Sequence, residues 1–138
     1  MIWQGKPSHH CAKGFTLIEL LIVMVIMGLL ASLVAPEMFA KVGSSKRKTA
    51  QAQMQMLATS LDAYRLDIGQ YPQDLNELRN SDQKNWDGPY VPKALPMDPW
   101  SNPYIYRFPG TAGAYDLKSL GADGKEGGED ENADIVLQ

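Results

Sequence analysis

One long apolar run dominates the pattern of hydrophobic and polar positions in this chain. It extends from Phe15 to Ala35, and Glu19 is its only charged residue. About 20 apolar residues are enough for a helix to cross the hydrocarbon core of a bilayer. A carboxylate in such a helix costs roughly 2.5–3.5 kcal/mol on insertion scales and by default marks a functional position. The run therefore predicts a membrane-spanning helix in which Glu19 has a task of its own.

A second apolar pattern, with steps of three and four residues, predicts an amphipathic helix. Its apolar face consists of Ala50, Met54, Leu57, Leu61, Tyr64 and Ile68. The positions expected to face solvent or neighbouring molecules are Gln51, Gln53, Gln55, Asp62 and Arg65. We expect one long helix from about Phe15 to Ile68, ended by Gly69. Because Pro36 removes a backbone hydrogen bond and clashes with the preceding turn, residues 33–36 should kink or unwind. The alternative is a helix that stops at Ala35.

The rest of the chain predicts short elements separated by loops. Residues 74–78 indicate a short helix with Leu75 and Leu78 facing inward. Residues 80–103 are rich in Pro, Gly, Asn and Asp, which is typical of loop. Alternating apolar and polar positions predict strands over residues 104–108 and 114–120, and a third over residues 134–137. A helix followed by a few adjacent strands indicates the α+β class.

The composition fits one small domain and argues against nucleic-acid binding. The chain has 138 residues and a net charge of −3. Residues 1–14 hold Lys6 and Lys13 and no acid, so without them 11 basic and 16 acidic residues remain, which gives −5. Binding to a phosphate backbone needs clustered excess cations. The one basic cluster, residues 46–48 with Lys41 nearby, is interpreted as a solvated helix face or an interfacial anchor.

The chain offers no nucleophile–base pair after residue 14. His9, His10 and Cys11 all lie before Gly14. The glycine-rich stretches lack the strand–loop–helix context and the Lys-Ser/Thr pair of a phosphate loop. Trp100 is interpreted as a packing anchor in a loop that the neighbouring prolines fix. We therefore expect that the protein is not an enzyme.

The junction before the apolar run carries the most specific motif. A secretory signal would have a shorter apolar stretch before its cleavage site, and a plain membrane anchor leaves Glu19 unexplained. The string GFTLIELLIVMVIMGLLASLVAP, which begins at Gly14, closely resembles the class III signal of type IV pilins and type II secretion pseudopilins. The resemblance implies that a prepilin peptidase cuts after Gly14 and methylates Phe15. It also implies that Glu19 neutralises the N-terminal amine of a neighbouring subunit, which makes a buried carboxylate tolerable.

Residues 121–138 form an acidic, glycine-rich segment with six acids and one lysine. Oxygen donors without Cys or His suit calcium, which takes roughly 6–8 of them in flexible geometry. Since both histidines lie before Gly14, zinc has no evident site. An EF-hand over residues 123–134 is rejected because Lys125 and Gly127 occupy ligand positions and no helix pair flanks the loop. From composition alone, a disordered acidic tail is the alternative.

Three further blocks resemble the major pseudopilins of type II secretion. They are LDAYRLD (61–67) before Tyr71-Pro72, DPWSNPY (98–104), and YDLKSLGADG (115–124) with ADI (133–135). The resemblance implies a pilin-like fold, with a long N-terminal helix packed on a small antiparallel sheet and a C-terminal calcium-binding loop. It implies one structural calcium, with carboxylates from Asp123 and Asp134 and the backbone carbonyl of Leu120. The carbonyl of Lys125 and one or two neighbouring groups complete the set: Asp130, Asn132 or Glu131.

The resemblance also implies an organisation and a location. Residues 1–14 are a leader that is removed, 15–35 the membrane and assembly helix, 36–69 its soluble half, and 70–138 the periplasmic globular part. The protein would be a single-pass protein of the bacterial inner membrane with a cytoplasmic N-terminus. The positive-inside rule alone leaves this orientation ambiguous, because basic residues lie on both sides of the run.

The function implied is that of the major structural subunit of a periplasmic pseudopilus, which drives export of folded proteins across the outer membrane. Its expected partners are copies of itself, minor pseudopilins, the inner-membrane assembly platform and the prepilin peptidase. A type IV pilin for adhesion, motility or DNA uptake is the alternative. Such pilins commonly close a C-terminal loop with a disulfide, and no cysteine follows Gly14. A single-pass anchor for an acidic binding domain is a third class, which cleavage after Gly14 would exclude.

Overall fold

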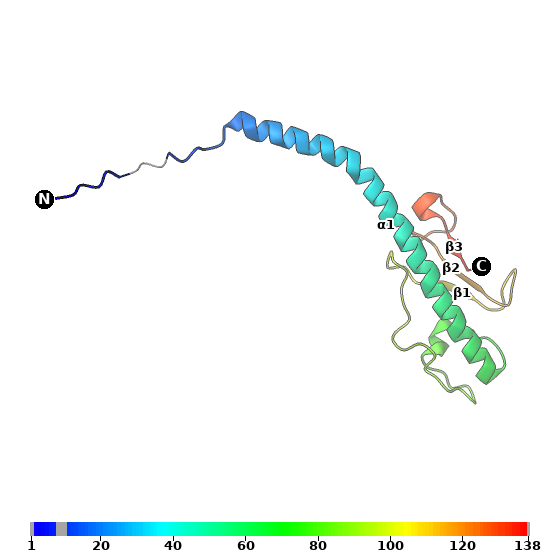
Figure 1. The fold of residues 1–138 in the computed structure, drawn as a ribbon. Coiled ribbons are helices and arrows are strands. Elements are labelled where there is room, and N and C mark those ends of the chain that lie inside the picture. Colours follow the sequence, from blue (N-terminus) through cyan, green and yellow to red (C-terminus); the bar gives the residue numbers. More distant parts are fainter. Residues whose placement is uncertain (1, 8–10, 138) are drawn as a thin grey trace. The chain divides into compact units, whose positions relative to one another are not determined.

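The computed structural model describes residues 2–7 and 11–137 (Figure 1). Contacts divide the chain into two units, one up to Phe39 and one from Ala40 onward. Helix α1 (Leu17–Ile68) belongs to both. The elements that follow are η1 (Leu75–Leu78), β1 (Ile105–Arg107), β2 (Asp116–Ser119), η2 (Asp130–Asn132) and β3 (Ile135–Val136).

The first unit contains the apolar part of α1. This is the one helix in the described residues that is long and apolar enough to cross a membrane, and its most apolar window has a mean hydropathy of 2.8. None of that window is buried inside the protein. Residues 33–36 are helical, so unwinding near Pro36, one of the two predicted outcomes, is wrong, as is the alternative of a helix ending at Ala35. The other outcome, a kink, stays a prediction. The proline removes one hydrogen bond, and the helix on either side keeps the α conformation.

The helix begins at Leu17, two residues after the approximate start predicted at Phe15. Thr16 stands directly before it, and its hydroxyl accepts a hydrogen bond from the Glu19 amide at 3.3 Å. A residue in this N-cap position lies outside the helical conformation. The predicted C-terminal end is confirmed: α1 ends at Ile68, and Gly69 follows with a φ of +95°.

The second unit is built on one face of α1. Five of the six predicted apolar positions, Ala50 to Tyr64, are buried, and Ile68 is partly buried against the same core. The packing is completed by Leu78 of η1, Val91 of the following loop, and Leu117 and Ile135 of the sheet. Figure 1 shows the strands beside this half of the helix. The amphipathic pattern of the sequence is therefore confirmed.

The three strands form one antiparallel sheet in the order β1-β2-β3. Ile105 pairs with Lys118, and Ser119 pairs with Ile135. All three predicted strands exist but are shorter than expected. Proline lies on both sides of β1, at residues 103 and 109, and it cannot donate to a ladder. After β2, Gly121 has a φ of +73°, which turns the chain away.

A buried tyrosine joins α1 to the segment that follows it. The Tyr64 hydroxyl donates to Glu77 in η1 at 2.6 Å. Burial, with the Glu77 hydrogen bond second, raises the pKa of Tyr64 to about 12. The phenol therefore stays neutral at physiological pH and keeps its proton for this bond.

Leu61→Ala should lower the free energy of unfolding by about 2–5 kcal/mol, because the leucine is fully buried and its truncation leaves a cavity. The control is Leu66→Ala on the same helix, where the side chain is 86% exposed and the loss should stay within about 0.5 kcal/mol. Denaturant unfolding of the full chain in detergent measures both. Equal losses would contradict the assigned core face.

Candidate functional site

The predicted processing junction lies in an open, irregular segment. Residues 11–16 have no regular secondary structure, and Phe15 is exposed. Apart from Gly14 and its two chain neighbours, no described residue has an atom within 4 Å of the place that a Cβ on Gly14 would occupy. The described backbone on both sides of Gly14 is therefore open and irregular.

Glu19 makes a reciprocal cap at the start of α1. Its carboxylate Oε2 accepts a hydrogen bond from the Thr16 amide at 3.4 Å, while the Thr16 hydroxyl accepts from the Glu19 amide. This arrangement is a capping box, which satisfies two amides that have no partner within the helix. Sequence reasoning missed it, although Thr-x-x-Glu before an apolar run is its signature. Glu19 thus has a local partner within its own chain.

The acidic loop between β2 and β3 is closed at its base. The Ala122 amide donates to the Glu131 carbonyl at 2.9 Å. At Gly121 a Cβ would lie 2.8 Å from that carbonyl oxygen and 2.9 Å from the oxygen of Ala133. Only glycine fits this approach and its positive φ. The two limbs of the loop, which meet where residues 121–122 lie against residues 131–133, are therefore held together. This excludes the disordered tail for the described residues.

A buried carboxylate outside the loop supports one limb. Asp98 is 3% exposed, and its Oδ2 accepts from the Ser119 hydroxyl at 2.7 Å. Its Oδ1 accepts from the amides of Trp100 and Asn102. The Asn102 amide group in turn donates to the Gly121 carbonyl at 3.2 Å. The loop at residues 98–102 thus forms a brace: its hydrogen bonds to Ser119 and Gly121 support the start of the acidic loop. Trp100, in the same loop, is partly buried against the core as expected.

Among the predicted calcium ligands, Asp134 has an oxygen atom that is available to bind a metal ion. Its Oδ2 accepts from the Gly127 amide at 3.3 Å and lies 3.8 Å from the Lys118 ammonium. Its Oδ1 is buried and has no hydrogen-bond partner among the residues that the structure describes. An unpaired buried carboxylate oxygen is costly. A cation bound at this oxygen would remove the cost.

The other predicted ligands lie on the same loop but do not converge on Asp134 through their side chains. Asp123, Lys125, Asp130 and Asn132 are exposed, and Leu120 is half-buried. Asp123 accepts from the Lys125 amide at 3.1 Å. Within residues 2–7 and 11–137, no three His, Cys, Asp or Glu side chains gather as a metal site. His9 and His10 lie outside the described residues.

The donor set nevertheless fits calcium. The predicted groups supply only oxygen atoms, from carboxylates, an amide and backbone carbonyls, and calcium accepts this mixture. The Oδ1 of Asp134, which has no hydrogen-bond partner in the described residues, is available to coordinate a metal ion. Leu120 and Lys125 would contribute backbone carbonyls rather than side-chain atoms. The ligand set therefore stays a prediction that the residues permit.

One ion pair lies at the edge of this loop. Lys118 donates to Glu126 at 2.8 Å. The hydrogen bond from Lys118 lowers the pKa of Glu126, and the same bond raises the pKa of Lys118. Both groups are therefore charged at neutral pH, and Lys118 offsets part of the negative charge of the loop.

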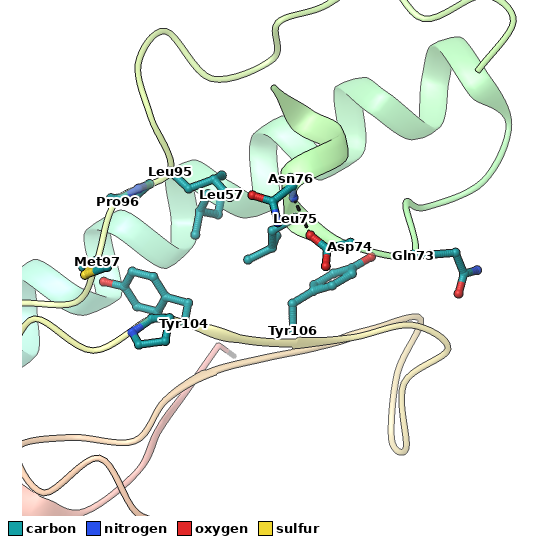
Figure 2. A pocket seen from close by; sticks show the side chains of 11 residues that line it. Leu57, Gln73, Asp74, Leu75, Asn76, Leu95, Pro96, Met97, Tyr104 and Tyr106 are labelled. Atoms are coloured by element: carbon teal, nitrogen blue, oxygen red, sulfur yellow. Dashed lines mark hydrogen bonds between the residues drawn. The ribbon is translucent and has the colours of Figure 1, made fainter. Parts of the chain in front are cut away.

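A separate cavity of about 290 Å³ lies between α1, η1 and the loop before β1 (Figure 2). Its polar groups serve the local fold. Asp74 caps η1 by accepting from the Asn76 amide at 2.7 Å, and the Tyr106 hydroxyl donates to the Pro72 carbonyl at 2.7 Å. Leu57, Leu75 and Leu95 line its apolar wall.

Comparison with known proteins agrees with these features. Residues 37–138 match the family model described as type II secretion system, protein G, and residues 9–35 match the prokaryotic N-terminal methylation motif. The type II secretion system core protein G of Pseudomonas aeruginosa is 46% identical over 89% of this chain and 92% of its own. That of Vibrio cholerae is 42% identical over 88% of each chain.

The fold comparison points the same way. The crystal structure of the major pseudopilin from the type 2 secretion system of enterohaemorrhagic Escherichia coli matches with a TM-score of 0.59 and 31% identity. The match covers 71% of this chain and 90% of that one. A long helix with a small antiparallel sheet is therefore the fold that both share. The chain belongs to the type II secretion system protein G family, the major pseudopilins.

Proposed function

We propose that this pseudopilin polymerises through the apolar part of α1 into a periplasmic fibre that drives export of folded proteins across the outer membrane. The observation that carries the proposal is the apolar surface of that helix. None of its most apolar window is covered by the rest of the chain, and Glu19 lies in its first turn. In a membrane, lipid covers such a surface, and in a fibre the helices of other copies replace the lipid.

The proposed topology is a single pass through the inner membrane, with the N-terminus in the cytoplasm and the globular unit in the periplasm. A prepilin peptidase cuts after Gly14 and methylates Phe15. Assembly then brings the protein into contact with copies of itself, minor pseudopilins and the inner-membrane platform. The net charge of −3 gives no support for a nucleic-acid partner.

We infer two successive partners for the Glu19 carboxylate. In the single chain it accepts from the Thr16 amide. In the fibre it pairs with the N-terminal amine of Phe15 on a neighbouring copy, where burial among apolar helices demands a compensating cation. The charge, rather than the cap, is then what assembly requires.

We also propose that the acidic loop binds one calcium ion through the predicted ligand set. Calcium that binds only the folded chain stabilises it by RT ln(1 + [L]/Kd), about 2.7 kcal/mol at 100 times Kd. The support is the free buried Oδ1 of Asp134 and a donor set made of oxygen alone. The only cysteine of the chain, Cys11, lies in the leader, so in the mature protein the cation would take the place of a crosslink.

Processing should yield a mature chain that begins at Phe15. N-terminal sequencing of the protein purified from membranes measures this directly. Gly14→Val should leave the full-length chain, because a side chain then occupies the open position at the cut. Gly5→Val, also in the leader, should still be cut. A mature N-terminus at another residue would exclude the proposed junction.

Glu19→Gln should insert into the membrane but lose most fibre assembly, measured by sheared-fibre yield and crosslinking between copies. Glutamine still accepts the Thr16 amide bond and so keeps the capping box, but it cannot neutralise an amine. The matched control is Glu37→Gln, an exposed carboxylate on the same helix, which should assemble normally. Normal assembly by Glu19→Gln would show that the cap alone matters.

Calcium should raise the melting temperature of the full chain in detergent, and excess chelator should lower it. Asp123→Ala should melt near the chelated temperature with or without calcium. Asp82→Ala removes an exposed acid outside the loop and should leave the calcium response intact. A melting temperature that ignores both calcium and chelator would refute the calcium proposal.

A further inference from the structure

Arg47 reaches from α1 to the acidic loop. Its Nη1 donates to the backbone carbonyl of Asp130 at 3.3 Å and to that of Ala133 at 3.0 Å. The interpretation of residues 46–48 as only a solvated face or an interfacial anchor is therefore wrong for Arg47. Its neighbour Lys48 is exposed, and no side-chain hydrogen bond or ion pair of Lys48 occurs in the described part of the chain.

The helix surface around Arg47 is shaped for the loop. Gly43 lies one turn earlier on the same face and is buried. A Cβ at Gly43 would overlap the carboxylate of Glu131, which lies against the helix backbone. The short helix η2 thus packs on α1 at two positions, Gly43 and, one turn later, Arg47. These two contacts hold the limb of the loop opposite to the one that Asn102 supports.

Arg47 binds backbone carbonyls rather than carboxylates, which distinguishes holding the loop backbone from neutralising its acids. An arginine placed to neutralise the acids would pair with a carboxylate, and bidentate pairing is its usual geometry. Arg47 instead binds the backbone carbonyls of Asp130 and Ala133, and in the described part of the chain it makes no ion pair with the Asp130 or Asp134 carboxylate. Asp134 directly follows Ala133, whose carbonyl Arg47 binds. The Oδ1 of Asp134 is the carboxylate oxygen without a hydrogen-bond partner among the described residues.

We propose that Arg47 is a positioning residue for cation binding, which holds residues 130–134 in the conformation that presents their ligand atoms. The inference rests on the proposed calcium site. Without Arg47 the two carbonyls lose their shared donor, and the limb that bears Asp134 is tied to α1 less firmly. The cation must then order this limb as it binds, which weakens its affinity.

A positioning role and a purely electrostatic role of Arg47 predict opposite changes in calcium affinity when Arg47 is removed. Arg47 carries a positive charge close to the loop, so a purely Coulombic role makes its removal favour calcium. A positioning role makes its removal weaken calcium binding, and loss of groups that orient metal ligands typically costs about 10–100-fold in affinity. The direction of the change therefore decides between the two.

The test is isothermal titration of calcium into the full chain in detergent micelles. Arg47→Gln should bind at least about tenfold more weakly than the parent chain. Lys48→Gln removes the same charge from the adjacent position and should bind equally well or slightly more tightly. Unchanged or tighter binding by Arg47→Gln would overturn the proposal.

Scanning calorimetry of the same proteins with calcium and with chelator separates positioning from general stability. If Arg47 positions the loop, the calcium-induced rise in melting temperature shrinks in Arg47→Gln. If Arg47 only stabilises the fold, both melting temperatures fall equally and the rise persists, which overturns the proposal. Should Arg47→Gln not fold, Arg47→Lys keeps the charge but not the planar two-donor group, and weaker calcium binding is again expected. A parent chain without any calcium response would instead refute the calcium site itself.

Discussion

The packing of one face of α1 is the interaction on which the globular unit depends. The sheet has only three short strands, and much of the chain between residues 69 and 104 is irregular. Neither could bury enough apolar surface alone. Met54, Leu57 and Leu61 supply the common surface on which η1, the loops and the sheet pack. The same helix continues into the membrane segment, so one element serves both the fold of the subunit and its proposed assembly.

The acidic loop shows how a chain without a cysteine after Gly14 orders a charged segment. Hydrogen bonds from outside hold both limbs: the Asp98 brace on one side and Arg47 on the other. The limbs meet at Gly121, where backbone approaches backbone. These contacts order the backbone but leave one carboxylate oxygen of Asp134 unpaired. A cation and these contacts would then act together, because a loop ordered in advance loses less entropy when an ion binds.

Glu19 illustrates why a local role and an assembly role are compatible. A helix N-terminus attracts an anion through its free amides and its dipole. The same end lies two residues after the new amine that processing would create. A carboxylate in the first turn can therefore stabilise the helix in the single chain and remain within reach of an amine in the fibre.

The sequence by itself was sufficient for the features that depend on neighbours along the chain. The apolar run, the buried face from Ala50 to Tyr64 and the three strands follow local periodicity, and the N-terminal methylation motif is contiguous in sequence. Tertiary structure alone decided the long-range polar contacts. Asp98 meets Ser119 across 21 residues, and Arg47 meets Ala133 across 86. No periodicity records such pairs, because they depend on which surfaces the core brings together.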